Sequence, residues 1–228
     1  LNLPRLGMST SDQDDLFRRL DALLDLAAQS LITKRAVLER YTEEGLYPYA
    51  RYYLRDIKAR HGHYWHNHYS TIGIVGLEEC VQQFEGTSLR EADGRRLGLA
   101  VLDFIRDRLT RFQNKTGTPF NLEATPAEGA SYRLAVLDRH RFGPLCESEP
   151  NDTVAVYSNS SQPPVDAFDD PFALLEHQDE FQQKYTGGTV LHFWLKERIE
   201  DTRSVRRFVR SVCENYRLPY FTLTPTFS

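Results

Sequence analysis

Short β-rich segments alternate along this chain with longer helical patterns, and this alternation most limits how the chain can fold. Residues 90–112 are predicted to form the longest clean helix, with apolar side chains recurring on one face. β-Branched and aromatic residues concentrate at 70–76, 153–157, 189–193 and 220–224. Strands separated by helices predict an α/β domain with a largely parallel sheet. No internal repeat appears, and the one linker-like stretch, 144–152, is predicted to be a surface loop.

Further helices are predicted from apolar spacing and end signals. Ser11 or Asp12 can cap a helix that continues or restarts as far as Tyr41, before Gly45 and Pro48 stop it. Helical patterns also cover 77–84, 131–140 and 204–216. Residues 1–8 are predicted to be a strand end that leads into a loop.

Composition excludes several classes of function. The 228 residues are 40% hydrophobic and 12% aromatic, enough for a sizeable core. No apolar run approaches the ~20 residues of a membrane helix, and the first residues lack the order of a signal peptide, so we expect a cytoplasmic protein without a membrane partner. A net charge of −4 argues against nucleic-acid binding. The arginines at helical spacing are predicted to form a solvated face: Arg203, Arg206, Arg207 and Arg210.

The three cysteines are far apart, at Cys80, Cys146 and Cys213. The absence of a paired motif excludes a recognisable zinc module or redox dithiol, so no metal is expected within this chain. Cys80 and Cys213 lie on apolar helical patterns and are predicted to be buried as small hydrophobic residues.

The segment 121–135 has no apolar periodicity before about Ser131. It places Glu123, Thr125 and Glu128 beside a proline and a glycine. One interpretation is an ordinary helix entry with Glu128 in the favourable first turn. The other is a shaped loop that carries a functional site.

Seven segments, in this order, closely resemble the second half of the catalytic barrel of the anaerobic (class III) ribonucleoside-triphosphate reductases. They are NLPRLG (2–7), GLYPYARYYL (45–54), NHYSTIGIVGLEE (67–79), NLEATPAEGASYRLA (121–135), YSNSSQPPV (157–165), QKYTGGTVLHFWL (183–195) and ENYRLPYFTLTPTFS (214–228). The resemblance implies a single region, 1–228, forming about half of a ten-stranded α/β barrel of the glycyl-radical type.

The resemblance also implies radical chemistry that this chain does not complete. In the family, a cysteine thiyl removes the 3′-hydrogen of the substrate, and a glycyl radical installed by a radical-SAM activase generates that thiyl. The radical cysteine, the glycyl and zinc segment and the regulatory ATP-binding domain match no part of this sequence. We therefore expect no cofactor within it and no activity from it alone. The complete enzyme implies a homodimer that acts on ribonucleoside triphosphates, often with formate as reductant.

The resemblance assigns the chain the substrate side of the barrel. Asn2 is matched to a position near the radical loop, where its amide can bind a ribose hydroxyl. Glu123 is matched to an acid–base or hydroxyl-orienting role, or else to the formate pocket. Predicted substrate-binding residues are His68, Ser70, Thr125, Ser158, Asn159, Thr224, Thr226 and Ser228. By itself the final TPTFS segment is an ordinary strand exit, but within the resemblance it is predicted to bind phosphate.

Two further motifs leave alternatives open. His61, His63, His66 and His68 fall within eight residues, which suits a metal site, an exposed loop with adventitious affinity, or a mixture of buried and surface histidines. The glycine pair of YTGGT could bind phosphate or allow a close backbone approach.

Two functions from different classes fit these observations. The first is a catalytic-barrel portion of an anaerobic ribonucleotide reductase. The alternative is a catalytically silent nucleotide-binding or assembly module derived from that barrel. Other glycyl-radical enzymes fit less well, because they are not expected to share the 121–135, YTGGT and TPTFS segments.

Overall fold

The chain folds into helices and short parallel strands, as the alternation predicts. A computed structural model describes residues 1–143, 156–164, 167–195 and 201–225. The elements in chain order are α1 (Leu3–Met8), α2 (Gln13–Glu43), α3 (Pro48–Tyr53), α4 (Arg55–His61), β1 (Ser70–Gly73), α5 (Leu77–Glu85), α6 (Ala92–Thr116), β2 (Phe120–Glu123), α7 (Glu128–Phe142), α8 (Pro171–Gln183), β3 (Leu191–Leu195), α9 (Thr202–Asn215) and β4 (Phe221–Pro225). Within these ranges, no helix is long and apolar enough to cross a membrane.

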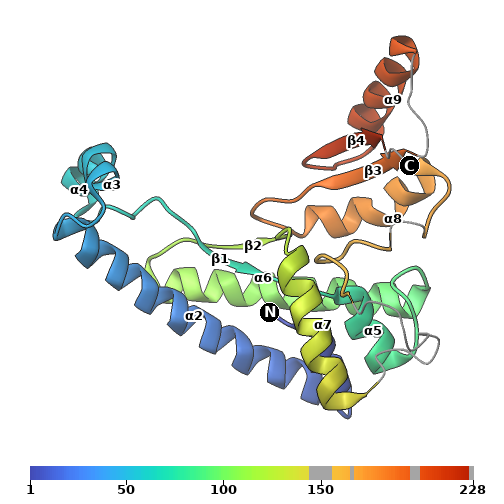
Figure 1. Cartoon of the computed structure of the whole chain (residues 1–228), viewed down its shortest axis with the longest axis horizontal. Coiled ribbons are helices and arrows are strands. Elements are labelled where there is room, and N and C mark those ends of the chain that lie inside the picture. Colours follow the sequence, from blue (N-terminus) through green and yellow to red (C-terminus); the bar gives the residue numbers. More distant parts are fainter. Residues whose placement is uncertain (144–155, 165–166, 196–200, 226–228) are drawn as a thin grey trace.

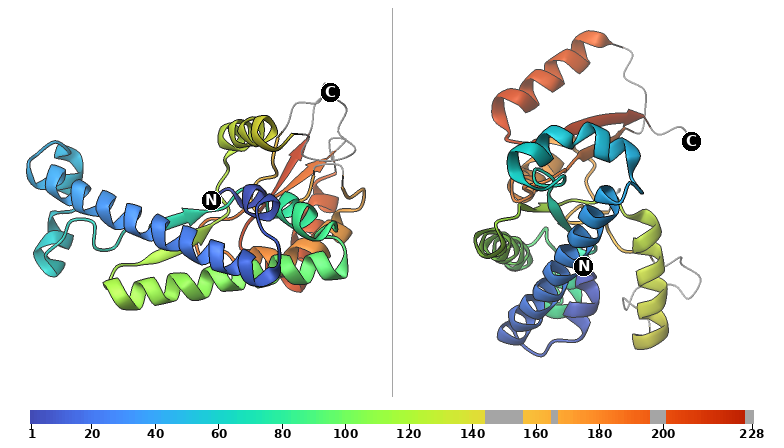
Figure 2. Two further views of the ribbon diagram at one scale, coloured as in Figure 1. Left: turned by 90° about the horizontal axis from the view of Figure 1, so that it is seen from below. Right: turned by 90° about the vertical axis from the view of Figure 1, so that its left-hand side faces the viewer.

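The strands form two separate parallel pairs (Figures 1 and 2). β1 pairs with β2 so that Gly73 lies opposite Glu123, and β3 pairs with β4 so that Trp194 lies opposite Thr224. The prediction of parallel strands in an α/β chain is therefore confirmed. The described residues form two small sheets rather than a continuous half of a ten-stranded barrel. Of the predicted strand at 153–157, residues 153–155 lie outside the described ranges, and Val156 and Tyr157 are not in a strand.

Two more segments add to the β1–β2 sheet through backbone hydrogen bonds. On the β2 side, Ala124 N–H donates to Gly188 O at 2.9 Å and Gly187 N–H donates to Leu122 O at 2.8 Å. On the β1 side, Val75 N–H donates to Leu1 O at 2.9 Å, and Leu3 N–H donates to Val75 O at 3.2 Å. Four chain segments thus lie side by side at the carboxyl end of this sheet.

The long helices α2 and α6 pack together beneath the sheet (Figure 1). Asp12 caps α2 by accepting the Asp15 N–H at 2.8 Å, as predicted. Both helices place apolar residues on one face, where they meet the buried face of β1 and β2. Their buried residues include Leu16, Leu20, Leu24, Leu97, Val101, Ile105 and Leu109. The predicted helix at 90–112 is confirmed, although the 31-residue α2 is longer than the 25-residue α6.

The first residues form a helix, so the predicted strand exit and loop at 1–8 is wrong beyond Asn2. Asn2 caps α1 by accepting the Arg5 N–H at 3.2 Å, and Pro4 suits the first helical turn because it lacks an N–H. α1 packs against α5 so closely that a Cβ on Gly7 would lie 2.5 Å from the carbonyl oxygen of Cys80. The strand prediction holds only for the single bridge between Asn2 and Val75.

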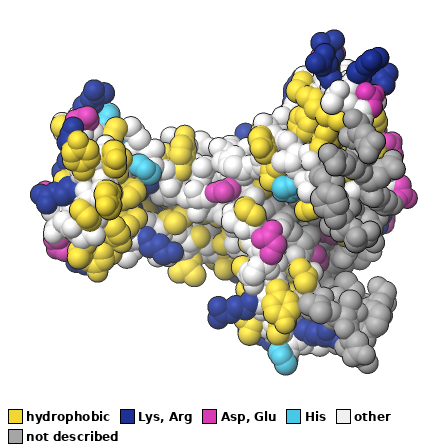
Figure 3. Space-filling view, turned by 45° about the horizontal axis from the view of Figure 1, so that its top comes forward, with side chains coloured by type: hydrophobic (Ala, Val, Ile, Leu, Met, Phe, Trp, Pro, Cys, Tyr) yellow, Lys and Arg dark blue, Asp and Glu magenta, His cyan; other side chains and the backbone are white. Residues whose placement is uncertain are grey.

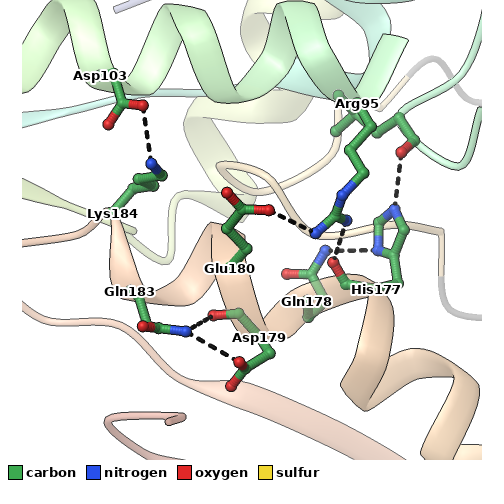
Figure 4. Close-up of polar contacts among 9 residues, drawn as sticks. Arg95, Asp103, His177, Gln178, Asp179, Glu180, Gln183 and Lys184 are labelled. Carbon is green, nitrogen blue, oxygen red and sulfur yellow. Dashed lines mark hydrogen bonds and ion pairs between the residues drawn. The ribbon is translucent and has the colours of Figure 1, made fainter. Parts of the chain in front are cut away.

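The sequence patterns do not predict α8, whose polar contacts with α6 are shown in Figure 4. Arg95 on α6 pairs with Glu180 at 3.1 Å and also donates to the His177 carbonyl at 2.7 Å. Lys184 pairs with Asp103 of α6 at 2.8 Å. Phe181, on α8, packs between this helix and α6 and is fully buried. These contacts fix α8, and with it β3, against α6.

β3 and β4 bury one face and leave the other polar. Their apolar face packs on α8 and α9 through Leu175, Leu191, Phe193 and Val212. The opposite face carries His192, Trp194, Thr222 and Thr224, because successive side chains along a strand alternate between faces. The β1–β2 sheet has the same division, with Thr71, Gly73, Asn121 and Glu123 away from the buried helices.

Two exposed regions stand out on the surface (Figure 3). Large hydrophobic side chains cover the far end of α2 and the pair α3–α4, among them Leu46, Tyr49, Tyr52 and Tyr53. Pro48 begins α3 there, after α2 has ended at Glu43. The four arginines of α9 are exposed, as predicted.

Of the two cysteines that the structure describes, one has the predicted burial and the other does not. Cys80 is buried, as predicted, and burial raises the pKa of its thiol to about 12. Cys213 is exposed, so the prediction of burial is wrong. Val212, the preceding residue, faces the core instead. Cys146 and the loop at 144–152 lie outside the described residues.

Candidate substrate-side site

Glu123 ends β2 on the polar face of its sheet. Leu122 and Phe120 point into the core, so Asn121 and Glu123 point the other way. The glycine pair of the YTGGT segment runs alongside, and a Cβ on Gly188 would lie 3.4 Å from Glu123 Oε1. A Cβ on Gly187 would lie 2.8 Å from Asn121 Nδ2. Of the two interpretations of this glycine pair, the structure supports close backbone approach.

The loop after β2 is shaped by the residues that follow Tyr157. Asn159 accepts hydrogen bonds from the Ala127 N–H at 3.2 Å and the Ser131 hydroxyl at 3.3 Å. Its own amide donates to Glu128 at 3.2 Å. Glu128 lies in the first turn of α7, as the helix-entry interpretation requires. Thr125 lies in the same loop and touches Gly73 closely enough that a Cβ on that glycine would clash with its hydroxyl.

Ser158 is bound to a partly buried carboxylate, Glu79, to which no sequence motif pointed. Its N–H and its hydroxyl each donate to Glu79 of α5 at 2.7 Å. Burial raises the pKa of Glu79, and the two hydrogen bonds from Ser158 oppose that rise only in part. Ser158 therefore tethers the 157–161 loop to the start of α5.

Asn2 lies at the same end of the sheet, next to Val75, and Val75 also bridges to Asn159. The Asn2 amide donates to Asp138 of α7 at 2.8 Å. The segments around Asn2, Glu123 and Asn159 are therefore brought together at the carboxyl ends of β1 and β2. This is the edge at which α/β proteins bind ligands.

The other predicted residues lie elsewhere. Ser70 begins β1 and accepts a hydrogen bond from Arg35 at 3.1 Å, so it lies at the amino end of the strand, with His68 before it. Their chain neighbours Asn67 and Tyr69 help to line an open hollow of about 510 Å³, together with His66, Gln113, Asn114 and Thr118. A strand length separates His68 and Ser70 from Glu123.

Thr224 lies on β4, on the polar face of the second sheet. Its hydroxyl is 3.3 Å from that of Thr222, which in turn lies 2.8 Å from His192 Nδ1. Thr226 and Ser228 lie outside the described residues. His192 was not predicted, although its alternation with Leu191 and Phe193 places it on the polar face.

The histidine cluster does not assemble into a chelating group. The rings of His61 and His66 stack at 4.2 Å, and the His68 ring contacts Trp65 edge-on at 4.8 Å. Across the described ranges, no three histidine, cysteine or acidic side chains are placed to hold a metal ion. His61, His63 and His68 are exposed and His66 is partly buried, closest to the interpretation as a surface loop.

Comparison with known proteins agrees with these features. The family model described as "Anaerobic ribonucleoside-triphosphate reductase" matches residues 1–228, the whole chain. The chain belongs to this reductase family. Its relatives include the anaerobic ribonucleoside-triphosphate reductases of Haemophilus influenzae, 26% identical over 203 residues, and Salmonella typhimurium, 27% identical over 203 residues. In both cases 84% of this chain aligns with 28% of the relative.

Solved structures of the family have the same fold. A structure named "Anaerobic ribonucleotide reductase" matches 98% of this chain with a TM-score of 0.81 and 25% identity, over 35% of its own length. The Thermotoga maritima anaerobic ribonucleotide reductase with glycerol in its active site matches 97% of this chain with a TM-score of 0.78 and 25% identity, over 34% of its length. The chain thus spans about a third of the reductases that it resembles.

Proposed function

We propose that this chain is a catalytic-barrel portion of an anaerobic ribonucleotide reductase that converts ribonucleoside triphosphates to deoxyribonucleoside triphosphates. One observation carries the proposal beyond the family match. Asn2, Glu123, Thr125, Ser158 and Asn159 come from three distant parts of the sequence and meet at one edge of the parallel sheet. That edge is where a substrate is expected in an α/β fold.

In the complete enzyme, we infer that the two sheets become parts of one ten-stranded barrel. Both sheets cover one face with helices and keep the other face polar, as the inner wall of a substrate-binding barrel requires. The backbone bonds from Leu1 and Gly188 already extend the first sheet on both edges. The remaining strands would come from the two thirds of the family's length that this chain does not span.

Within this barrel, Glu123 would serve as the acid–base group or orient a ribose hydroxyl, and Asn2 would bind a ribose hydroxyl. A carboxylate can exchange the proton that leaves with the 2′-oxygen as water. Thr125 lies two residues beyond Glu123 and would bind substrate beside it, together with Ser158 and Asn159. His68 and Ser70 would contact the substrate only if it reached the amino end of β1. The proposed site therefore depends less on these two residues.

The radical chemistry is assigned to the rest of the enzyme. The described cysteines do not fit a thiyl or zinc role, because Cys80 is buried with its pKa raised to about 12 and Cys213 is on the surface of α9. A glycyl radical, a zinc site, formate, a radical-SAM activase and a homodimeric assembly are all expected for the complete protein. A cytoplasmic location fits that chemistry.

The silent-module alternative rests on a specific observation. Asn2 and Ser158 both make hydrogen bonds to carboxylates of this chain, the buried Asp138 and the partly buried Glu79, as residues with only a structural role would. One experiment distinguishes the reductase from the silent module. The complete protein, activated anaerobically by its radical-SAM partner, should form deoxyribonucleotides from ribonucleoside triphosphates when formate or a dithiol protein is present. Nucleotide binding without turnover under both reductants would support the silent module.

Substrate phosphate is proposed to bind at Thr224–Ser228, where hydroxyls and backbone N–H groups follow β4. Thr226→Val in the complete enzyme is expected to weaken triphosphate binding by about 1–2 kcal/mol, because one hydrogen bond to a charged acceptor is lost. Equilibrium dialysis with labelled nucleotide measures this change. Thr110→Val is the matched control, since the exposed Thr110 hydroxyl donates to the Arg106 carbonyl of its own helix. Phosphates bound instead on the arginines of α9 would contradict the assignment.

A further inference from the structure

Asp138 of α7 is a fully buried carboxylate at which three distant segments meet. Arg5 Nε donates to its Oδ1 at 2.6 Å. The Asn2 amide and the Tyr157 hydroxyl both donate to its Oδ2, at 2.8 and 3.0 Å. Since an unpaired buried carboxylate is costly, these three donors, the Arg5 guanidinium among them, offset the burial of Asp138.

The same contacts leave the Asn2 side chain only one orientation. Asp138 Oδ2 accepts hydrogen bonds from both Asn2 and Tyr157, so the amide nitrogen of Asn2 faces Asp138. The Arg5 backbone N–H can only donate, so Asn2 Oδ1 must face the start of α1, at 3.2 Å. A flipped amide would place oxygen against oxygen and N–H against N–H. The amide geometry is therefore set by Asp138 and the helix start together.

This orientation leaves Asn2 one amide hydrogen and one oxygen lone pair with no partner among the described residues. Asn2 is partly exposed, whereas Asp138 is not. A ribose hydroxyl needs both a donor and an acceptor, and the Asn2 amide presents them side by side. Asp138 itself is too deeply buried to touch a substrate.

We propose that Asp138 is a positioning residue for the reaction, which acts by holding the Asn2 amide in its substrate-binding orientation. This inference rests on the proposed function, because the proposed function assigns Asn2 to bind a ribose hydroxyl. It predicts that Asp138 matters to turnover only through Asn2. A purely structural carboxylate would instead affect stability, whatever residue stood at position 2.

A double-mutant cycle in the complete, activated enzyme tests the proposal. Asn2→Ala is expected to lower kcat by ~100-fold, and Asp138→Asn by ~10–100-fold, since a small misplacement of a positioning group costs that much. In the Asn2→Ala background, Asp138→Asn should lower kcat by no more than about twofold, because the pair acts as one unit. Asp107→Asn, on the exposed face of α6, is the matched control and should leave kcat unchanged.

Three results would overturn the proposal: independent losses that multiply in the double mutant, an Asn2→Ala enzyme of normal kcat, or an Asp138→Asn enzyme of normal kcat. If Asp138→Asn does not fold, Asp138→Glu keeps the charge and shifts the acceptors by one methylene. It should then lower kcat in the native background and not in Asn2→Ala. A wild-type enzyme that lacks reductase activity overturns the proposed function itself and the inference with it, whereas an active wild type with additive losses overturns the inference alone.

Discussion

Replacing Glu123 with glutamine in the complete reductase is expected to lower turnover by ~100-fold or more, because the amide keeps the shape of the side chain but cannot exchange a proton. Nucleotide affinity should change by no more than a few-fold, since Glu123 is assigned to the reacting ribose rather than to the triphosphate. Steady-state kcat, together with the dissociation constant of the nucleotide, measures the two effects separately.

Glu128→Gln provides the matched control. Glu128 follows Glu123 by five residues, is exposed and accepts one hydrogen bond from Asn159. Its replacement by glutamine should therefore leave kcat nearly unchanged. Equal losses from both substitutions would point to a general disturbance of the loop. Normal turnover of Glu123→Gln with a weakened dependence on formate would move Glu123 to the reductant pocket.

The largest expected loss of stability follows from Phe181→Ala. Phe181 is fully buried between α8 and α6, with the Arg95 guanidinium 5.0 Å from its ring and the His177 ring 5.5 Å away. Removing a buried phenylalanine ring costs about 3–5 kcal/mol through lost transfer energy and the cavity left behind. Native-state hydrogen exchange at the amides of α8 in the complete protein reports this change as a lower free energy of local opening.

Phe172→Ala, on the first turn of the same helix, is the comparison. Phe172 is 40% exposed and its ring lies 5.6 Å from that of Phe208 on α9, so the loss should be about 1 kcal/mol. Equal losses at both positions would show that α8 is not held to α6 through Phe181.

The sequence predicted the elements whose packing follows one simple period. α5 and α6 follow from apolar spacing, and the start of α2 follows from Asp12, because the cap and the buried stripe agree. α8 was missed because the face it buries includes Gln178 and Gln182, which make hydrogen bonds in the interior and break the apolar period. α1 was missed although Asn2 and Pro4 are recognisable signals of a helix start.

The candidate site was predictable only in part. The family resemblance singled out Glu123, Asn2 and Ser158, and their loops do meet. The partners Asp138 and Glu79 could not be found from sequence, because each depends on contacts between residues more than 75 positions apart. Strand register also determines which predicted residues lie near Glu123. Ser70 begins β1 and Gly73 ends it, so only Gly73 reaches the edge of the sheet that carries Glu123.

The four segments that lie side by side around β2 have a consequence for how the protein is made. β2 pairs with β1, which lies about fifty positions before it in the sequence, and with the glycine pair, which lies more than sixty positions after it. The Arg5–Asp138 hydrogen bond joins residues 133 positions apart. Such distant pairings slow folding, because the entropy of long loops is lost before the contacts form. On the ribosome, α2 and α6 can pair early, but the edge that carries Glu123 cannot close until Gly188 has been synthesised. Chaperone dependence and translation rate should therefore affect this edge more than they affect the helical layer.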